Sequence, residues 1–434
     1  MYLRRRFYIA MTVVILACAA GTAVPVLFAV GRWLLLLLVL TLAAEAGLLW
    51  SRRGITAVRL LSDRFSNGDE NPVRIRVEST YPFMVALQVI DEIPFVFQRR
   101  DVCFRVSLNK YGETTIRYDL TPTQRGIYGF GHIRVFASTR IGLLERRFTC
   151  GRPTDVRVYP SFLMLRQYEL LALSNQLTEM GIKRIRRIGH NTDFEQIKDY
   201  IVGDDYRTIN WRATARRHQL MVNVYQEERS QHVYCIIDKG RTMQQVFQGM
   251  TLLDYAVNAS LVLSFVAVNR HDRAGLVTFS DCFETFLPAS RQQGHMQQLQ
   301  EALFNEQTQF RETDYSALVA GLSQHVSHRS LLVLFTSFTS MTALRRQLSF
   351  LRQLAVRHRL LVVFFEDNEL RQFVATGSTS SEDYYQHVIA SRFLYEQQLV
   401  VQTLRQHGIP SLLTLPQNLC IDVINKYLEI KARS

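Results

Sequence analysis

The sequence contains few cysteines, and none of them belongs to a short paired motif. Its 434 residues include six cysteines, spread so widely that no two form a C-x-x-C pair. Structural zinc sites and dithiol redox sites need closely spaced thiols, so we expect neither. We interpret the cysteines as reduced thiols in a reducing compartment. They are Cys18, Cys103, Cys150, Cys235, Cys282 and Cys420.

The signature motifs of common enzymes are missing as well. The chain has no G-x-S-x-G, no H-E-x-x-H and no G-x-x-x-x-G-K-[ST], and its 11 histidines are scattered. Those motifs build a nucleophile elbow, a catalytic zinc site and a phosphate loop. The glycine-rich run at 125–131 lacks dinucleotide-binding spacing, and we interpret it as a turn and a bulge. The sequence therefore predicts a protein that is not an enzyme.

Acidic residues are outnumbered by basic ones. The chain has 51 Lys and Arg against 38 Asp and Glu, a net charge of +13. This balance suits anionic lipid, nucleic acid or an acidic partner. Because no long basic block occurs, we favour a basic surface beside membrane lipid and expect no nucleic-acid partner. The short basic cluster at 183–187 is either a phosphate contact or a solvated linker.

Two apolar runs occupy the N-terminal region. Phe7–Val30 contains no charged residue, and Trp33–Trp50 contains a single one, Glu45. Each run is close to the roughly 20 residues that cross a bilayer. Gly31-Arg32 between them reads as a tight turn. Residues 1–56 are therefore predicted to form a transmembrane hairpin.

The charges that flank the hairpin predict its orientation. Three arginines precede the first run and three follow the second, whereas one lies between the runs, so both ends should be cytoplasmic. Glu45 either has a function inside the membrane or snorkels to the headgroups, which we favour. The expected location is the bacterial inner membrane, with two passes and cytoplasmic soluble domains. The flanking arginines are Arg4, Arg5, Arg6, Arg52, Arg53 and Arg59.

The remaining chain changes its hydrophobic period twice. Apolar residues alternate with polar ones over 57–160, which indicates a β-sandwich domain. Residues 161–230 are expected to be a helical linker that carries a signature motif. Over 231–434, buried strands alternate with amphipathic helices, so the fold class is α/β with a doubly wound parallel sheet. The expected strands are 233–237, 274–279, 331–335, 360–365 and 409–415, with an edge strand at 282–287; the expected helices are 252–269, 318–326, 344–357, 382–406 and 419–430.

Polar residues follow several of these strands. In doubly wound sheets, ligands bind beyond the carboxyl ends of the strands, so these residues are candidates for a site. Asp238, Gly240 and Thr242 follow the first strand, and Thr336 and Ser337 follow the strand at 331–335. Thr313 is a further candidate, which follows Phe310 just before a helix.

This layout resembles the von Willebrand factor A domain, whose metal-ion-dependent adhesion site uses Asp-x-Ser-x-Ser, a Thr and an Asp. Asp238, Thr242 and Thr313 match that pattern. The resemblance implies that their oxygens would hold Mg²⁺, which prefers six oxygen ligands.

Two positions depart from the adhesion-site pattern. Gly240 replaces a Ser and offers no side-chain oxygen, and Thr336 or Ser337 replaces the Asp. The sequence therefore predicts a degenerate site, held by hydrogen bonds rather than by a cofactor. Binding of Mg²⁺ is the less favoured alternative.

A longer motif lies upstream, within the expected linker. It includes Gly203-Asp204-Asp205, Arg207, Trp211 and Arg216. The motif resembles the signature of domain-of-unknown-function family 58, whose members combine a membrane hairpin, a β-rich domain and a von Willebrand A domain. The resemblance implies a partnership with a MoxR-type AAA+ ATPase and neighbouring membrane proteins, in complex assembly or envelope stress. Residues 140–143 depart from the family pattern, in an expected turn.

The paired carboxylates of this motif have a structural interpretation. Adjacent Asp residues in an extended segment point to opposite faces, so Asp204 and Asp205 should not share one site. We expect one of them to cap a helix that begins near Arg207, and Trp211 to anchor the segment on the sheet domain.

The leading hypothesis is a membrane-anchored interaction or scaffold protein. Its strand-end loops would bind a partner. One alternative is a metal-dependent hydrolase that uses Asp204, Asp205 and Asp238. Another is an exported adhesion module, which requires the opposite membrane topology.

Overall fold

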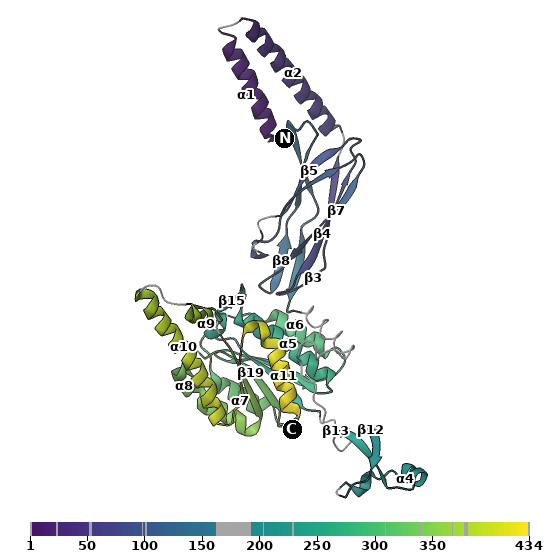
Figure 1. Cartoon of the computed structure of the whole chain (residues 1–434), viewed down its shortest axis with the longest axis vertical. Helices are drawn as coiled ribbons and strands as arrows, with labels where there is room; N and C mark the ends of the chain where they lie inside the picture. Colours follow the sequence, from purple (N-terminus) through teal and green to yellow (C-terminus); the bar gives the residue numbers. More distant parts are fainter. Residues whose placement is uncertain are drawn as a thin grey trace. The chain divides into compact units, whose positions relative to one another are not determined.

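The computed structural model describes residues 2–22, 25–51, 54–97, 99, 102–161, 192–202, 204–227, 230–308, 310–338, 340–366, 368–376 and 381–432. The chain divides into two compact units, 1–159 and 160–434 (Figure 1). A mixed α/β fold with an apolar N-terminal helix and a strand-rich region is confirmed.

The first unit begins with two helices, α1 (Arg5–Ala20) and α2 (Pro25–Trp50). The turn predicted at Gly31-Arg32 is wrong, because both residues lie inside α2 and the turn falls ten residues earlier, at Gly21. Pro25 suits the first position of a helix, where its missing N–H costs nothing. A Cβ on Gly31 would lie 2.6 Å from the Cys18 sulfur, so this glycine allows the two helices to approach.

Helix α2 carries the membrane signal of the described chain. Its residues Val26–Trp50 are long and apolar enough to cross a bilayer. Leu252–Asn269 meets the same criteria of length and composition but is mostly buried as a core helix of the second unit. Helix α1 has 16 residues, about 24 Å of helix, which is short for a complete span.

Glu45 of α2 does not snorkel as expected. It is buried and accepts hydrogen bonds from the backbone N–H groups of Gly142 (3.1 Å), Leu143 (3.0 Å) and Leu144 (3.2 Å). The Thr139 hydroxyl donates a fourth, at 2.5 Å. A loop of the strand-rich region thus satisfies the carboxylate with four hydrogen-bond donors. A contact with a lipid headgroup at the surface would supply fewer.

Three sheets follow the helices in the first unit, and their inward residues form one core. Burial alternates strictly along β4, the period-two pattern seen in the sequence. All pairings are antiparallel except β3 with β11. The sheets are β1 (Tyr2–Leu3), β10 (Leu144–Cys150), β9 (Ile133–Ser138), β5 (Val85–Asp91) and β6 (Cys103–Leu108); β2 (Ile55–Leu60), β4 (Asn71–Ser79) and β7 (Glu113–Leu120); and β3 (Arg64–Ser66), β11 (Thr154–Tyr159) and β8 (Gly126–Phe130).

The segment from 192 to 227 forms an antiparallel hairpin of β12 (Thr192–Asp199) and β13 (Met221–Glu227). Between the strands lie a short 3₁₀ turn, η2 (Tyr206–Thr208), and a two-turn helix, α4 (Trp211–Arg217). A helical linker was expected here, so the hairpin differs from the prediction. The helix expected over 161–180 and the basic cluster at 183–187 lie outside the described residues apart from Ser161.

A six-stranded sheet organises the rest of the second unit. Its order is β18-β17-β14-β19-β20-β21, with β18 antiparallel at one edge and the other strands parallel. The strands predicted from the sequence are all present. They are β14 (His232–Asp238), β17 (Arg273–Phe279), β18 (Phe283–Ser290), β19 (Leu331–Phe335), β20 (Arg359–Phe365) and β21 (Ser411–Thr414).

Helices cover both faces of this sheet. One core contains Val233, Cys235 and Ile237 of β14 with α5 and α11, and the other contains Tyr234 and Ile236 with α7, α8 and α10. Helices α6 and α9 were not predicted. The helices are α5 (Leu252–Asn269), α6 (His295–Asn305), α7 (Tyr315–His325), α8 (Met341–Arg357), α9 (Asn368–Ala375), α10 (Ser381–Gln406) and α11 (Leu419–Ala432); short β15 (Val246–Phe247) and β16 (Met250–Thr251) pair between β14 and α5.

Candidate functional site

The candidate site lies at the carboxyl end of β14. This strand pairs with β17 on one side and with β19 on the other, so the chain order reverses beside it. Such a switch point leaves a crevice beyond the strand ends, where ligands of α/β sheets bind. Asp238 is the last residue of β14, and Thr336 directly follows β19. The topology therefore brings these two residues together, although 98 positions separate them.

The carboxylate of Asp238 is enclosed by protein donors. One oxygen, Oδ1, accepts from the Gly240 N–H (2.8 Å) and the Thr313 hydroxyl (2.7 Å). The other, Oδ2, accepts from the Thr336 hydroxyl (2.7 Å). Asp238 is only 1% exposed. The site is thus a closed cluster of hydrogen bonds around a buried acid.

Tyr315 completes this cluster, and the sequence did not indicate it. Its hydroxyl lies 2.8 Å from the Thr336 Oγ1 and 3.5 Å from the Asp238 Oδ2. The Tyr315 hydroxyl has one proton, for which the Thr336 Oγ1 and the Asp238 Oδ2 are alternative acceptors. A tyrosine two residues beyond a predicted ligand, at a helix start, was the available signal. Its ring looked like a core residue, which it also is, since it packs edge-to-face on Phe279.

Gly240 and Thr313 depend on each other. A Cβ on Gly240 would lie 1.8 Å from the Thr313 Oγ1, a separation that no structure accommodates. The threonine hydroxyl therefore occupies the space into which a serine side chain at position 240 would extend. The departure from the adhesion-site motif at Gly240 is what allows Thr313 to reach Asp238.

The other predicted site residues lie outside the cluster. None of the hydrogen bonds of the described residues joins Thr242 to Asp238, although Thr242 was expected to be a ligand. Ser337 contacts a neighbouring pocket instead. Of the predicted set, the structure brings together Asp238, Gly240, Thr313 and Thr336.

Electrostatics follow from burial. Desolvation raises the pKa of the Asp238 carboxyl, while the hydrogen bonds from Thr336, Thr313, Gly240 and Tyr315 act to lower it. Burial also raises the pKa of Tyr315 well above its usual range, and the nearby Asp238 charge adds to the effect.

The donor set fits a hydrogen-bonded cluster better than a divalent cation. Asp238, Thr313 and Thr336 are the residues that could offer oxygens to Mg²⁺. They include a single carboxylate, and both hydroxyls already point their protons at it. Mg²⁺ requires near-octahedral oxygen ligands and loses its water reluctantly, so this set is poorly matched.

A second network begins at the next residue, Lys239, which is buried. Its ammonium lies 2.5 Å from a Glu284 oxygen and 2.6 Å from a Glu306 oxygen. Burial acts to lower the pKa of Lys239, but the two carboxylates outweigh it and the pKa is raised. Hydroxyls of Thr285 (2.5 Å) and Thr278 (3.1 Å) donate to Glu306. Sequence reasoning missed this network, although a lysine at the end of a buried strand was a visible signal.

An acidic group with a thiol lies beside this network. Oxygens of Asp281 and Glu284 and the sulfur of Cys282 lie within 4.8 Å of one another. All three residues are exposed, and Arg311 binds Asp281 at 2.9 Å, which holds the pKa of that carboxyl below its usual range. The group is a charged turn between β17 and β18.

The carboxylates of the upstream motif are engaged within their own hairpin. Asp204 accepts from the Lys198 ammonium (2.9 Å) and the Ile201 N–H (3.0 Å). Asp205 caps η2 by accepting from the Arg207 N–H at 3.0 Å. None of the hydrogen bonds of the described residues joins either carboxylate to Asp238, and Gly203 lies outside the described residues.

Trp211 does not anchor the motif on the sheet domain, and that prediction is wrong. Its side chain is 70% exposed, as the first residue of α4. The cap of α4 comes instead from Asn210, which accepts from the Ala213 N–H at 3.0 Å. Arg216 in the last turn is also exposed. The hairpin is therefore held by local caps rather than by a buried tryptophan.

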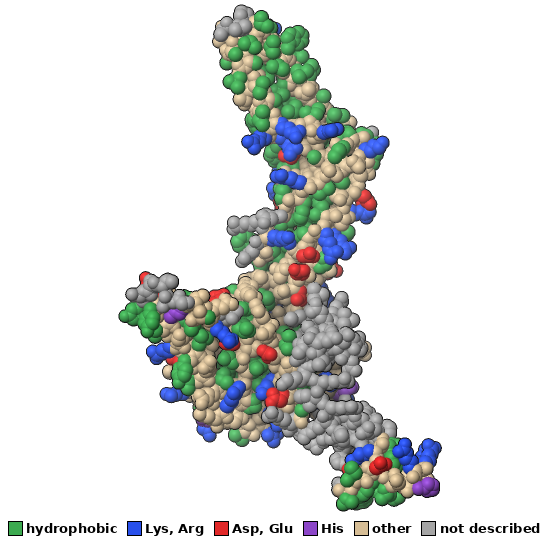
Figure 2. Space-filling view, viewed as in Figure 1, with side chains coloured by type: hydrophobic (Ala, Val, Ile, Leu, Met, Phe, Trp, Pro, Cys, Tyr) green, Lys and Arg blue, Asp and Glu red, His purple; other side chains and the backbone are tan. Residues whose placement is uncertain are grey.

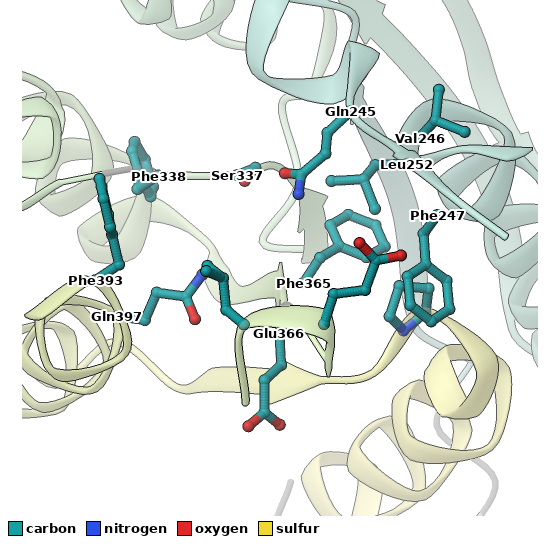
Figure 3. Close-up of a pocket in the computed structure, with 13 residues that line it drawn as sticks. Gln245, Val246, Phe247, Leu252, Ser337, Phe338, Phe365, Glu366, Phe393 and Gln397 are labelled. Atoms are coloured by element: carbon teal, nitrogen blue, oxygen red, sulfur yellow. The ribbon is translucent and has the colours of Figure 1, made fainter. Parts of the chain in front are cut away.

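A pocket of about 250 Å³ opens next to the Asp238 cluster (Figure 3). Phe338 and Phe393 lie on one side of it, and Phe247 and Leu252 on the other. Ser337, adjacent to the Thr336 that binds Asp238, links the two features.

Comparison with known proteins gives one family match. Residues 196–389 match the family described as protein of unknown function DUF58, so the resemblance predicted from the sequence is confirmed over this segment. Uncharacterized protein YeaD of Bacillus subtilis (strain 168) is 24% identical over 224 residues. That alignment covers 48% of this chain and 54% of YeaD, about half the length of each.

Two solved structures show a weak likeness. An aerotolerance-related membrane protein from Bacteroides fragilis is 12% identical, with 46% of this chain and 100% of that chain covered and a TM-score of 0.29. Conserved hypothetical protein BatB from Bacteroides thetaiotaomicron is 11% identical, with 47% and 100% covered and a TM-score of 0.32. At these scores the likenesses carry no argument about function.

Proposed function

We propose that the protein is a membrane-anchored, non-enzymatic interaction protein, and the match of residues 196–389 to the DUF58 family supports this. Its six-stranded sheet is a von Willebrand factor A-like domain that offers its strand ends to a partner. The strand-rich region of the first unit is a β-sandwich that follows a two-pass hairpin in the chain. The location is the bacterial inner membrane, with both soluble regions cytoplasmic.

The closed shell of Asp238 carries this proposal. An adhesion site that works through a metal leaves its carboxylate open to the ion and to a ligand of the partner. Here Thr313, Thr336 and Gly240 satisfy the carboxylate from inside the protein. The surface around it is therefore already ordered, and a partner can bind without an ion.

Titration calorimetry tests the metal-free part of the proposal. Full-length protein in nanodiscs, titrated with Mg²⁺ and Mn²⁺, should give no saturable heat, and wild type should match Asp238→Asn. Saturable binding that disappears in Asp238→Asn would establish a functioning metal site and contradict the proposal.

The family resemblance points to a MoxR-type AAA+ ATPase as the partner. Affinity purification from membranes should recover such an ATPase with the wild-type protein, and less of it with Asp238→Asn. A matched control is Asp272→Asn. Asp272 is also buried, but it precedes β17 at the amino-terminal ends of the parallel strands, opposite to Asp238. There its carboxylate accepts from the Gln231 N–H (3.0 Å) and pairs with the Lys431 ammonium (2.9 Å). Equal recovery of the ATPase with all three proteins would mean that the ATPase does not bind near Asp238. Recovery with none of them would mean that such an ATPase is not the partner.

A further inference from the structure

The pocket beside Asp238 is built by segments from the whole sheet domain. It lies beyond the ends of β19 and β20, and α9, α10 and the β15–β16 turn complete its walls (Figure 3). Most of its lining is apolar.

Its volume excludes a large ligand. Pockets for cofactors and drug-sized molecules enclose roughly 300–1,000 Å³. This one encloses about 250 Å³, so it suits a single large side chain. Pockets of that kind hold the anchor residues of protein interfaces, which are most often Trp, Tyr or Arg.

The lining selects an aromatic anchor. Phe247, Phe338, Phe365 and Phe393 surround the space, and aromatic rings pair favourably edge-to-face. Glu366 and Glu369 are among the lining residues, and Arg371 pairs with Glu366 at 3.3 Å. The walls are thus mostly apolar, with an ion pair beside them.

One polar atom in the wall has no partner. The Gln397 Oε1 is buried, and no hydrogen bond of the described structure reaches it. A buried acceptor left unsatisfied carries a desolvation cost. A ligand that brings a donor would relieve this cost. The indole N–H of tryptophan is a donor with no acceptor of its own, so it matches this atom better than a hydroxyl does.

Helix α10 extends the surface beyond the pocket. Ala390, Val400 and Leu404 of this helix are buried, whereas Tyr385 (71%), Ile389 (56%) and Phe393 (47%) in its first half are exposed. Figure 2 shows hydrophobic side chains gathered at the N-terminal end of α10. Residues four apart lie on one helix face, so the three form a ridge that ends at the pocket. A ridge of this type pairs with the apolar stripe of another helix.

From these features we infer that the pocket receives a tryptophan, presented by a partner protein's amphipathic helix. The helix would lie along Tyr385, Ile389 and Phe393, and its indole N–H would bind the Gln397 Oε1. This inference rests on the proposed function and specifies the chemistry of the partner.

N-acetyl-L-tryptophanamide is a direct probe of the pocket. Full-length protein in nanodiscs should bind it more tightly than the corresponding phenylalanine and alanine amides in a ligand-observed NMR titration. Gln397→Leu should weaken tryptophanamide binding about three- to tenfold, the usual worth of one hydrogen bond. The same variant should leave phenylalaninamide binding unchanged, because that ring has no donor.

Controls separate the pocket from general effects. Gln398→Leu makes the same substitution one position further along α10, at an exposed site, and should bind like wild type. Phe393→Ala should weaken both aromatic amides. Gln397→Leu should unfold no earlier than wild type, because it removes an unsatisfied atom at similar volume.

Several results would overturn the inference. These are the absence of binding by any aromatic amide, equal effects of Gln397→Leu and Gln398→Leu, or no preference for the indole. If Phe393→Ala converts a dimer into a monomer in sedimentation, the occupant is a second copy of this chain. If Gln397→Leu abolishes amide binding but still recovers the ATPase, the pocket inference fails and the proposed function stands.

Discussion

Gly240 and Thr313 share one small volume next to Asp238. We predict that Gly240→Ser destabilises the protein by about 1–3 kcal/mol through overpacking. Thr313→Ala should cost about 0.5–1.5 kcal/mol, the value of its hydrogen bond. The double variant should cost less than the sum, because removal of the hydroxyl makes room for the serine. Urea unfolding of the four proteins measures the coupling, and strict additivity would mean that the two residues do not meet.

Lys239 makes a comparable prediction for charge. Lys239→Met leaves Glu284 and Glu306 facing each other without a cation, and should cost about 1–3 kcal/mol at neutral pH, because Glu306 is only partly buried and Glu284 is exposed. Adding Glu306→Gln to that variant should recover part of the loss. If Lys239→Met unfolds like wild type, the ammonium does not stabilise the fold.

The pH dependence of stability follows from the raised pKa of Lys239. Its stabilisation is complete below the ordinary lysine value of 10.5 and is lost as the pH rises through the raised value, because the folded state then holds a proton that the unfolded state has released. Wild type should therefore lose more unfolding free energy than Lys239→Met between pH 10 and pH 12. Parallel losses in the two proteins, followed by chemical denaturation, would contradict this assignment.

Part of the candidate site was readable from single residues. Asp238, Gly240 and Thr336 were predicted because they lie at strand ends, which meet at one end of a parallel sheet, and Thr313 because it matches the adhesion-site pattern before a helix. Tyr315 and Lys239 were not, because a tyrosine ring and a lysine stem pack among apolar neighbours whatever their polar tips bind. Trp211 was expected to anchor the motif on the sheet domain, yet its side chain is 70% exposed.

Helix α2 and the loop before β10 are joined through one carboxylate. Because Glu45 accepts from Gly142, Leu143 and Leu144, Glu45→Gln should loosen that loop without unfolding the sheets. Hydrogen exchange at these three amides should become faster by about tenfold, the effect of roughly 1.4 kcal/mol. Glu145→Gln is a suitable control, since among the described residues the Glu145 carboxylate pairs with the partly exposed Arg4, at 3.7 Å. Unchanged exchange in Glu45→Gln would show that the carboxylate does not hold the loop.

The boundaries of α1 and α2 show how a local pattern misleads. Gly31-Arg32 interrupts an apolar run and reads as a turn, but glycine inside a helix also permits close packing of a second helix. The proximity of Gly31 to Cys18 decides between these readings, and it depends on the neighbouring helix. Helices α6 and α9 were missed for a related reason: both are short, and short helices depend on tertiary packing more than on periodicity.

The two compact units have separate cores, which predicts two unfolding transitions for the whole molecule. Ile75 and Leu334 are fully buried, one in each unit. Ile75→Ala should destabilise only one unit and Leu334→Ala only the other, each by the cost of a cavity, about 2–5 kcal/mol. Each variant should therefore lower only one of the two transition temperatures. Differential scanning calorimetry in nanodiscs distinguishes this from a single cooperative transition shifted by both variants.

The sequence alone determined the strands of the six-stranded sheet, the residues at their ends and the apolar character of α2, because hydrophobic period and run length are local properties of the chain. It did not determine where the helical pair turns, that Glu45 is enclosed, or which hydroxyls surround Asp238. The first outcome depends on the contact of two helices, and the other two on residues 75 to 99 positions apart that meet only after folding. Tertiary structure therefore decided that the strand-end site is a closed cluster of hydrogen bonds with an apolar pocket beside it.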